Sequence, residues 1–486
     1  MGKIDTKYKY FAKNTALFTI SNFGSKFLTF FLTLLYTRVF TTSEYGMADI
    51  ISTTATLCIL TLTLTIANSV MRFSIENVDK SDLVLRYGLR VLMRGSCALV
   101  IIAIIVRAFN IISWNDYAYI FLVLIFTTHA LEEMLNYYLR ALDKVNIMVF
   151  TSLASSAVKL ITSFLLLLVF KLGLIGYLIS LVTGPVCAIA IALFNIYPLK
   201  HTDATKEELK KLHSEMIRYS IPASINSLGW WITGSIDRYF LIAIEGTSIN
   251  GIYSVAYKIP AIMGTLANIF GQTWGLSAIR EYNSETKKDD SGFFTKMYNL
   301  YAAVVFVVCS LLILLNIPIA RVVFAKEFFD AWRYSPLLVV GTGCNCLAIF
   351  FGGVFSAAKH NSEMAYSMLA SMLTNIVLNA ILIPSFSAAG AAIATLVSYY
   401  VVLATRYLFS RKYLEFRIHL VRDHIAITLL ITQIVMNLRS DHFYIGQLAV
   451  FIIILAVYRT EWVGTSKKAL TFAKGNFRRK RIYGDE

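Results

Sequence analysis

Five basic side chains stand out because they fall inside long apolar segments of the chain. They are Lys26, Arg94, Lys159, Arg238 and Lys258. A lysine or arginine at the middle of a membrane costs about 2.5–3.5 kcal/mol, so it needs an acidic partner or water. Lys26 and Lys159 lie near the middle of their segments, too deep for their ammonium groups to reach the surface easily. These residues predict a water-accessible, positively charged cavity, which would favour an anion.

A group of titratable side chains lies close together on one predicted helix. His129, Glu132 and Glu133 are three and four residues apart, which places them on one helical face. With Asp237 they are candidates for binding a coupling proton or sodium ion, and the alternative is that they neutralise a facing lysine or arginine. We expect no other cofactor and no metal site, because the six cysteines form no C-x-x-C pair.

The composition places all these residues in a membrane protein. Of the 486 residues, 57% are apolar and only 15% are charged, whereas a soluble domain carries roughly 25% charge. Apolar runs of about 18 to 25 residues fit a hydrocarbon layer about 30 Å thick. The formal charge of +16 is explained by loops near anionic lipid headgroups, so nucleic acid is not an expected partner.

Hydropathy predicts an all-α protein with fourteen membrane-spanning helices. We expect them near residues 15–37, 46–70, 88–107, 117–139, 147–170, 173–194, 220–244, 250–276, 297–318, 335–357, 362–383, 388–409, 424–438 and 443–459. With a cytoplasmic N-terminus, the inner segments hold 33 lysines and arginines and the outer segments hold seven. The positive-inside rule therefore predicts that both termini are cytoplasmic.

The chain also repeats itself. The phrase T-S-x-x-G begins at Thr42 and again at Thr247, and L-A-S begins at Leu153 and again at Leu369. Six helices in each half predict two bundles related by a pseudo-two-fold axis along the membrane normal. The expected parts are an N-terminal lobe (1–194), a cytoplasmic linker (195–219), a C-terminal lobe (220–410), and helices 13 and 14 with a basic cytoplasmic tail (411–486).

Polar residues recur at helical spacing in six of the predicted spans, namely the first, second, fifth, seventh, eighth and eleventh. This pattern predicts that these spans line a cavity. Asn22, Asn226, Asn375 and Asn379 belong to these polar stripes. The same pattern is typical of helix contacts inside membranes, and the sequence leaves that alternative open.

Motifs of catalysis are missing from the sequence. It contains no G-x-x-x-x-G-K-[ST] phosphate loop, no D-x-D pair, and no H-E-x-x-H or G-x-S-x-G motif. The longest predicted outer loop, about 319–334, is too short to form a catalytic domain. We therefore expect a transporter and not an enzyme.

Several phrases in the chain resemble one family of exporters. They are Thr42-Ser43-Glu44-Tyr45-Gly46, Ile236-Asp237-Arg238-Tyr239-Phe240-Leu241, Asn250-Gly251-Ile252-Tyr253-Ser254-Val255-Ala256-Tyr257-Lys258, Asn375-x-x-x-Asn379, Ile383-Pro384 and Gly390-Ala391-Ala392. Their order and spacing over residues 1–410 resemble the polysaccharide-transport branch, the Wzx-type flippases, of the multidrug/oligosaccharidyl-lipid/polysaccharide exporter superfamily.

The resemblance implies export of a polyprenyl-diphosphate-linked oligosaccharide, such as an O-antigen or capsule repeat unit. The cargo would move from the inner to the outer leaflet of a bacterial cytoplasmic membrane by alternating access of the two lobes. Lys26 and Lys159 are the first candidates for contact with the diphosphate, followed by Arg238, Arg38 and Lys258. The four asparagines named above are candidates for contact with sugar hydroxyls.

Three alternative functions stay open. The chain could be a lipid II flippase, a drug/cation antiporter of the same superfamily, or a non-transporting scaffold of a glycan-assembly complex. The fourteen predicted spans and the lysines weigh against the antiporter. Expected partners are the lipid-linked glycan, anionic lipid headgroups and, as a further possibility, a polysaccharide polymerase with its chain-length machinery.

Overall fold

The fold is helical throughout the part of the chain that the structure describes. The computed structural model describes residues 32–112, 114–197, 205–282, 292–360, 362–415, 418–439 and 444–461, and these ranges contain no β-strand. Nine helices within them are long and apolar enough to cross a membrane. The predicted all-α membrane fold is confirmed, while the number of fourteen spans stays a prediction.

The chain forms two compact units. The first comprises residues 1–258 with two short later segments, Val322–Phe329 and Ile383–Ala388, and the second comprises the rest. The helices that follow the predicted linker thus pack with the first half of the chain. The predicted lobes follow the sequence repeat, and that division of the chain stays a prediction.

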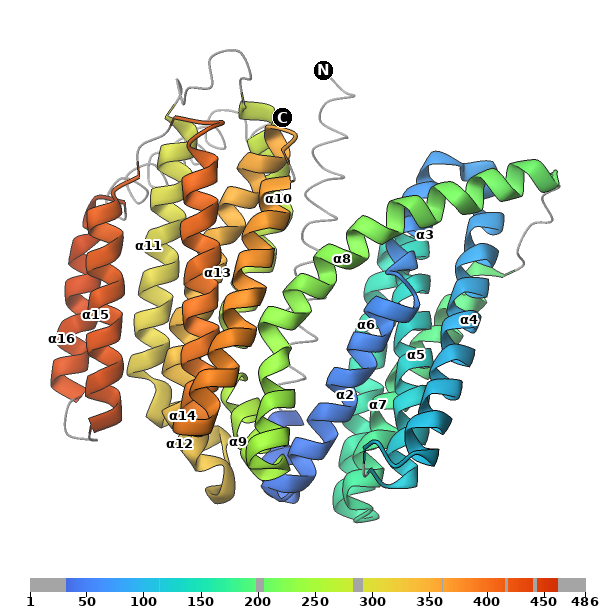
Figure 1. Cartoon of the computed structure of the whole chain (residues 1–486), viewed down its shortest axis with the longest axis horizontal. Helices are drawn as coiled ribbons and strands as arrows, with labels where there is room; N and C mark the ends of the chain where they lie inside the picture. The colour runs from blue at the N-terminus through green and yellow to red at the C-terminus, as the bar shows by residue number, and fades with distance from the viewer. Residues whose placement is uncertain are drawn as a thin grey trace, which may run out of the picture. The chain divides into compact units, whose positions relative to one another are not determined.

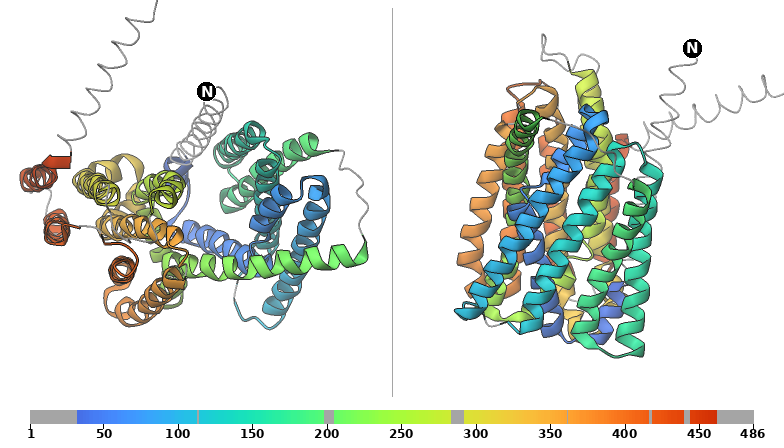
Figure 2. Two further views of the ribbon diagram at one scale, coloured as in Figure 1. Left: turned by 90° about the horizontal axis from the view of Figure 1, so that it is seen from above. Right: turned by 90° about the vertical axis from the view of Figure 1, so that its right-hand side faces the viewer.

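The first unit is a bundle of tilted helices (Figure 1). Its helices are α2 (Thr42–Leu62), α3 (Ile66–Glu76), η1 (Val78–Lys80), α4 (Ser81–Ala108), α5 (Asp116–Ala141), α6 (Val145–Phe164), η2 (Leu165–Val169), α7 (Gly173–Ile196), α8 (Lys206–Glu245) and α9 (Thr247–Ala256). The blue and teal helices of this unit run side by side, whereas the long green helix α8 runs obliquely to them (Figure 1 and Figure 2).

Two of these helices begin with a capping box. At the start of α2, the Thr41 hydroxyl accepts a hydrogen bond from the Glu44 N–H, and the Glu44 carboxylate accepts one from the Thr41 N–H. Thr205 and Glu208 form the same arrangement at the start of α8. Each box satisfies N–H groups that have no partner within the helix, which fixes where the helix begins.

The predicted span 46–70 is divided in the structure. Helix α2 ends at Leu62, and α3 begins at Ile66 after two residues in the left-handed region, Leu64 and Thr65. Because side chains other than glycine rarely adopt this conformation, the surrounding packing must hold it. The predicted single span therefore consists of two helices with a change of direction between them.

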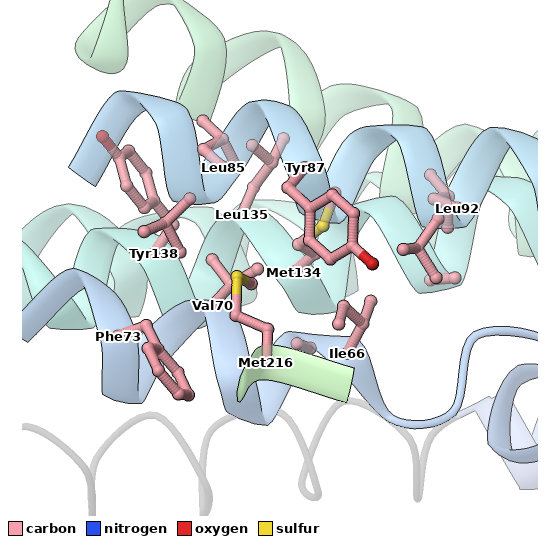
Figure 3. Packing of buried hydrophobic residues seen from close by; sticks show 14 of the residues in the cluster. Ile66, Val70, Phe73, Leu85, Tyr87, Leu92, Met134, Leu135, Tyr138 and Met216 are labelled. Carbon is pink, nitrogen blue, oxygen red and sulfur yellow. The ribbon is translucent and has the colours of Figure 1, made fainter. Parts of the chain in front are cut away.

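The linker helix packs into the core of the first unit. Met216 of α8 is fully buried against Ile66 and Val70 of α3, beside Met134 of α5 (Figure 3). The Ser69 hydroxyl also donates a hydrogen bond to the Met216 carbonyl oxygen at 2.9 Å. Residues 206–219 of the predicted cytoplasmic linker and the predicted seventh span form the single helix α8, with Pro222 inside it.

The two T-S-x-x-G phrases lie against each other. The Thr42 and Ser248 hydroxyl oxygens are 2.6 Å apart, and the Ser43 and Thr247 hydroxyl oxygens are 2.7 Å apart. The second phrase follows the first by 205 residues, so Thr42 corresponds to Thr247 and Ser43 corresponds to Ser248. The Thr42–Ser248 pair is therefore the counterpart of the Ser43–Thr247 pair. The starts of α2 and α9 therefore meet about a local two-fold axis.

Glycines make this close approach possible. A Cβ added at Gly46 would collide with the Thr247 carbonyl group, and one added at Gly251 would collide with the Thr42 carbonyl group. The Asn250 side-chain amide also donates a hydrogen bond to the Gly46 carbonyl oxygen at 3.1 Å. We call the contact between residues 42–46 and 247–251 the α2–α9 clasp.

The second unit contains the later helices and is described separately. They are α10 (Ala261–Glu281), α11 (Phe293–Leu314), α12 (Asn316–Val323), η3 (Lys326–Arg333), α13 (Ser335–Ala357), α14 (Ser362–Ser410), α15 (Leu420–Arg439) and α16 (Tyr444–Val457), with the two short exceptions given above. Helix α14 departs from helical geometry at Ser387, close to Pro384. That break lies between the predicted spans 362–383 and 388–409.

A buried polar seam joins α15 and α16 to α11. The Asp423 carboxylate accepts hydrogen bonds from the hydroxyls of Tyr298 and Tyr458, at 2.9 and 2.8 Å. Further along α15, the Gln433 amide oxygen accepts a hydrogen bond from the Ser310 hydroxyl at 2.8 Å. Polar side chains buried in apolar surroundings must be paired, so this seam fixes the register of the last two helices.

Candidate functional site

A polar cavity in the first unit has a volume of about 220 Å³. Helices α2, α5, α6 and α7 and the turn after α9 form its walls. Its polar lining consists of Tyr45, Asp49, Ser52, Thr56, His129, Lys159, Tyr177 and Lys258. These walls include the predicted second, fifth and eighth spans, together with the fourth and sixth, whose contribution the sequence did not predict.

Lys159 projects from α6 into this cavity. Helix α7 packs closely against α6 at Gly184. A Cβ added at Gly184 would lie only 2.6 Å from the Ser155 carbonyl oxygen and 3.2 Å from the Lys159 Cβ. Lys159 makes no ion pair with any residue that the structure describes. An ammonium group without an ion-pair partner can form charge-assisted hydrogen bonds to an anion.

Lys258 approaches the same cavity from the turn after α9. Its Nζ lies 5.9 Å from the ring centroid of Tyr45, another lining residue. Within the described ranges it too makes no ion pair. The only described acid in the lining is Asp49, so the two lysines leave the lining with an excess of positive charge.

Asp49 connects the cavity with the second repeat. Its Oδ2 lies 2.9 Å from the Arg238 Nε, and it accepts a hydrogen bond from the Ser254 hydroxyl at 2.7 Å. The side chains of Arg238 and Asp49 are only 13% and 19% exposed, so solvent screens this ion pair weakly. The Arg238 guanidinium also lies over the Tyr257 ring, 4.9 Å from its centroid.

Asp237 is fully buried beside this ion pair. Its Oδ2 accepts hydrogen bonds from the Tyr253 hydroxyl at 2.5 Å and the Tyr257 hydroxyl at 3.1 Å. Its Oδ1 accepts a hydrogen bond from the Arg238 backbone N–H at 2.9 Å. The same Oδ1 lies 3.9 Å from the Arg238 Nη1, so Arg238 pairs with Asp237 as well as with Asp49.

The cluster on α5 is divided between different environments. His129 lines the cavity, and its Nε2 lies 3.2 Å from the Leu181 carbonyl oxygen. Glu132 is half-buried and Glu133 is exposed. Of the three, only His129 is a lining residue.

The remaining predicted site residues lie elsewhere. Arg38 and Asn226 are exposed in the first unit. Asn375 and Asn379 are buried in α14, where the Asn379 amide donates a hydrogen bond to the Asn375 oxygen at 2.9 Å. Asn22 and Lys26 lie outside the described residues, so their assignment stays a prediction.

Four polar lining residues, Tyr45, Asp49, Ser52 and Tyr177, have no role predicted from the sequence. The first three share one face of α2, and the position of Asp49 next to Arg238 depends on the contact between α2 and α8. Tyr177 belongs to the sixth predicted span, for which no polar stripe is predicted. In the described ranges, no cluster of three or more histidine, cysteine or acidic side chains could hold a metal ion.

The chain is similar in sequence to one known family. The profile of the family described as polysaccharide biosynthesis protein matches residues 11–274, more than half of the chain. A comparison with curated proteins found no match.

Solved transporter structures share the fold. The lipid II flippase MurJ, in an inward closed conformation, matches with a TM-score of 0.62 at 16% identity, covering 92% of this chain and 98% of its own. A multidrug resistance MATE family transporter of the MOP superfamily, in an inward-facing conformation, matches with a TM-score of 0.60 at 13% identity, covering 85% and 96%. The family match bears out the predicted resemblance to polysaccharide exporters, and at these identities the structural likeness shows the fold alone.

Proposed function

Because the chain belongs to the polysaccharide biosynthesis protein family and has the fold of membrane transporters, we propose that it is a flippase for a lipid-linked glycan. The cargo would be an oligosaccharide attached to a polyprenyl diphosphate. Alternating access of the two lobes would carry its headgroup from the cytoplasmic to the outer leaflet.

The observation that carries this proposal is the pair of lysines in one polar cavity. Lys159 and Lys258 enter it from different helices, and neither is neutralised by an ion pair with a described residue. A diphosphate is strongly anionic and cannot cross hydrocarbon unprotected. Charge-assisted hydrogen bonds from ammonium groups would replace the water that the diphosphate loses.

The rest of the lining suits a sugar. Ser52 and Thr56 of α2 place hydroxyl groups in the cavity, and Tyr45 and Tyr177 add aromatic rings that also carry hydroxyls. These groups can exchange hydrogen bonds with sugar hydroxyls. The apolar prenyl chain would stay in the surrounding lipid, where it loses no favourable contact.

Alanine substitution of each lysine tests the proposal. Hydrogen bonds to charged groups contribute about 1.5–3 kcal/mol, so we expect Lys159→Ala and Lys258→Ala each to lower flipping roughly 10- to 150-fold. The assay is flipping of a fluorescent polyprenyl-diphosphate-linked sugar in proteoliposomes, together with surface glycan in cells. Lys210→Ala, an exposed change on α8, is the matched control. Normal flipping in both cavity variants would contradict the proposal.

Lys26→Ala belongs in the same experiment. Lys26 is a predicted diphosphate contact in the first span, and we propose that it acts together with Lys159. The expected result is impaired export at normal protein levels. Normal export by the Lys26→Ala variant would show that Lys26 is not part of the proposed site. It would not bear on Lys159 and Lys258, which their own variants test.

The same assays separate the alternatives. A lipid II flippase would move lipid II in preference to other lipid-linked glycans, and its depletion would make lipid II accumulate inside the cell. A drug/cation antiporter needs a cavity that attracts cations, whereas the charged lining has two lysines and one aspartate. A non-transporting scaffold would retain glycan export in the lysine variants.

We also propose that His129 belongs to the coupling pathway, because it is a titratable side chain in the cavity wall. Glu132, Glu133 and Asp237 remain candidates for the same role. Flipping in proteoliposomes with an imposed proton or sodium gradient tests this assignment. Rates that depend on neither gradient would exclude ion coupling at these residues.

The proposed setting is a bacterial cytoplasmic membrane with both termini inside. Anionic lipid headgroups would contact the basic loops, and a polymerase with its chain-length machinery would receive the cargo outside. Labelling of single cysteines with an impermeant reagent tests the topology. Outside labelling at position 38 and protection at position 210 are the expected results.

A further inference from the structure

Asp49 lies in the cavity wall, about one helical turn after the α2 residues of the α2–α9 clasp. It lines the cavity that holds Lys159 and Lys258. Its Oδ2 atom also contacts Arg238 of α8 at 2.9 Å and Ser254 of α9 at 2.7 Å. One carboxylate therefore helps to hold α2 against the second repeat and faces the space where an anion would bind.

The Asp49 contacts lie within a longer row of polar contacts along α2. The hydroxyl pairs of the clasp are at one end. Further along, the hydroxyl oxygens of Thr54 and Tyr239 are 2.8 Å apart, and at the other end the Ser224 hydroxyl donates a hydrogen bond to the Leu60 carbonyl oxygen at 2.6 Å. The pairs at both ends are neutral. The ion pair between Asp49 and Arg238 is the charged contact of the row, so it is the contact on which a charged ligand would act most strongly.

A diphosphate in the cavity would compete with Asp49. Its negative charge would repel the Asp49 carboxylate and attract the guanidinium of Arg238. Both effects are strong because the pair is largely buried, where a low dielectric increases the energy between charges. A bound anion would therefore weaken the ion pair and with it the attachment of α2 to α8 and α9.

We propose that Asp49 is a positioning residue that couples the charge of the cargo to the α2–α9 clasp. In the empty carrier Asp49 holds the clasp closed through Arg238 and Ser254, and an anionic headgroup in the cavity releases it. The topology predicts that the clasp lies on the outer side, so an empty carrier would stay closed to the outside. This inference rests on the proposed function.

Disulfide formation across the clasp tests the coupling. The Thr42 and Ser248 hydroxyl oxygens are 2.6 Å apart, so the thiols of cysteines at both positions would lie close enough to be cross-linked when the clasp is closed. The pair is introduced after replacing Cys58, Cys97 and Cys187 by alanine, because the other three cysteines are buried. The rate of cross-linking in proteoliposomes reports the closed state.

We expect a polyprenyl diphosphate without sugar to slow cross-linking at least threefold in this parent protein. Asp49→Asn should slow it at least fivefold without the probe, and the probe should then have no further effect. Ser254→Ala, which keeps every charge, should give a smaller decrease. Asp116→Asn, an acid-to-amide change at a largely exposed position, is the control and should behave like the parent.

Two outcomes would overturn the inference. One is an Asp49→Asn protein that cross-links at the parent rate and still responds to the probe. The other is a parent that binds the radiolabelled probe without any change in cross-linking, which would leave the proposed function intact. If the parent does not bind the probe at all, the proposed function fails and the coupling fails with it.

Discussion

Gly46 offers a test of the clasp that depends on geometry alone. A Cβ at this position would lie 2.9 Å from the Thr247 carbonyl carbon and 3.0 Å from the Gly251 nitrogen, with the Thr247 carbonyl oxygen closer still. Carbon atoms in ordinary contact are about 3.5–4.0 Å apart. Gly46→Ala must therefore push the starts of α2 and α9 apart, by roughly 0.6 Å or more from the carbonyl carbon alone.

The cost of this displacement follows from what surrounds the added methyl group. Overpacking typically costs about 1–3 kcal/mol, and backbone atoms cannot move aside as a flexible side chain can. The displacement would also stretch the Thr42–Ser248 and Ser43–Thr247 contacts, now 2.6 and 2.7 Å. A change of about 1–3 kcal/mol corresponds to a 5- to 150-fold lower population of the closed clasp.

The assay is cross-linking between cysteines at positions 43 and 247, measured together with protein level and thermal stability in detergent. Gly251→Ala is the counterpart in the second repeat and should give a decrease of similar size. Gly264→Ala is the control, because a Cβ there would have no heavy atom within 4 Å. Parent rates of cross-linking in both clasp variants would refute the reasoning.

Three further predictions concern stability. Asn437→Leu removes a hydrogen bond to Gln447 in the buried seam and should lower the free energy of unfolding by about 1–3 kcal/mol. The measurement is the melting temperature in detergent, which should fall; an unchanged melting temperature would contradict the prediction. Lys80→Ala should change the free energy of unfolding by less than about 0.5 kcal/mol, because its pair with Glu208 is exposed, and a larger loss would show a role beyond that pair. The hydrogen bond from the Thr205 N–H, with the charge of Lys80, lowers the pKa of Glu208. The resulting stabilisation is present above the pKa of Glu208 in the unfolded chain and is lost as pH falls through its pKa in the folded protein. Hydrogen exchange in the first turn of α8, corrected for intrinsic rates, should therefore rise below about pH 4. Protection of these amides that persists at about pH 3 would contradict this prediction.

The sequence predicted the helical architecture well where local chemistry is informative. The break in α14 at Ser387 follows Pro384, which cannot continue a regular helix. The break between α9 and α10 falls at Pro260, a signal that the prediction of a continuous span over 250–276 did not use. The division between α2 and α3 had no such signal, because the left-handed residues there are Leu64 and Thr65.

The site was predictable in part, namely where the type of a single residue is informative. Charges such as Lys159 and Lys258 are conspicuous in apolar segments, so the sequence alone marks them as candidates for a polar cavity. Which acid stands beside which base depends on long-range packing. The ion pair of Asp49 with Arg238 joins positions 189 residues apart, and no local pattern in the sequence encodes it.

The local two-fold axis of the clasp has a consequence for how this chain arose. At the repeat offset, the counterpart of Asp49 is Ser254, and these two side chains contact each other at 2.7 Å. If two identical ancestral chains had met in this way, as homodimers do, this position would have faced its own copy, and two carboxylates there would have repelled each other. Within one chain the two copies can differ, so that one carries a hydroxyl at this position while the other carries a charge. The contact between Asp49 and Ser254 is thus asymmetric, although it lies at the centre of a symmetric pair of helices.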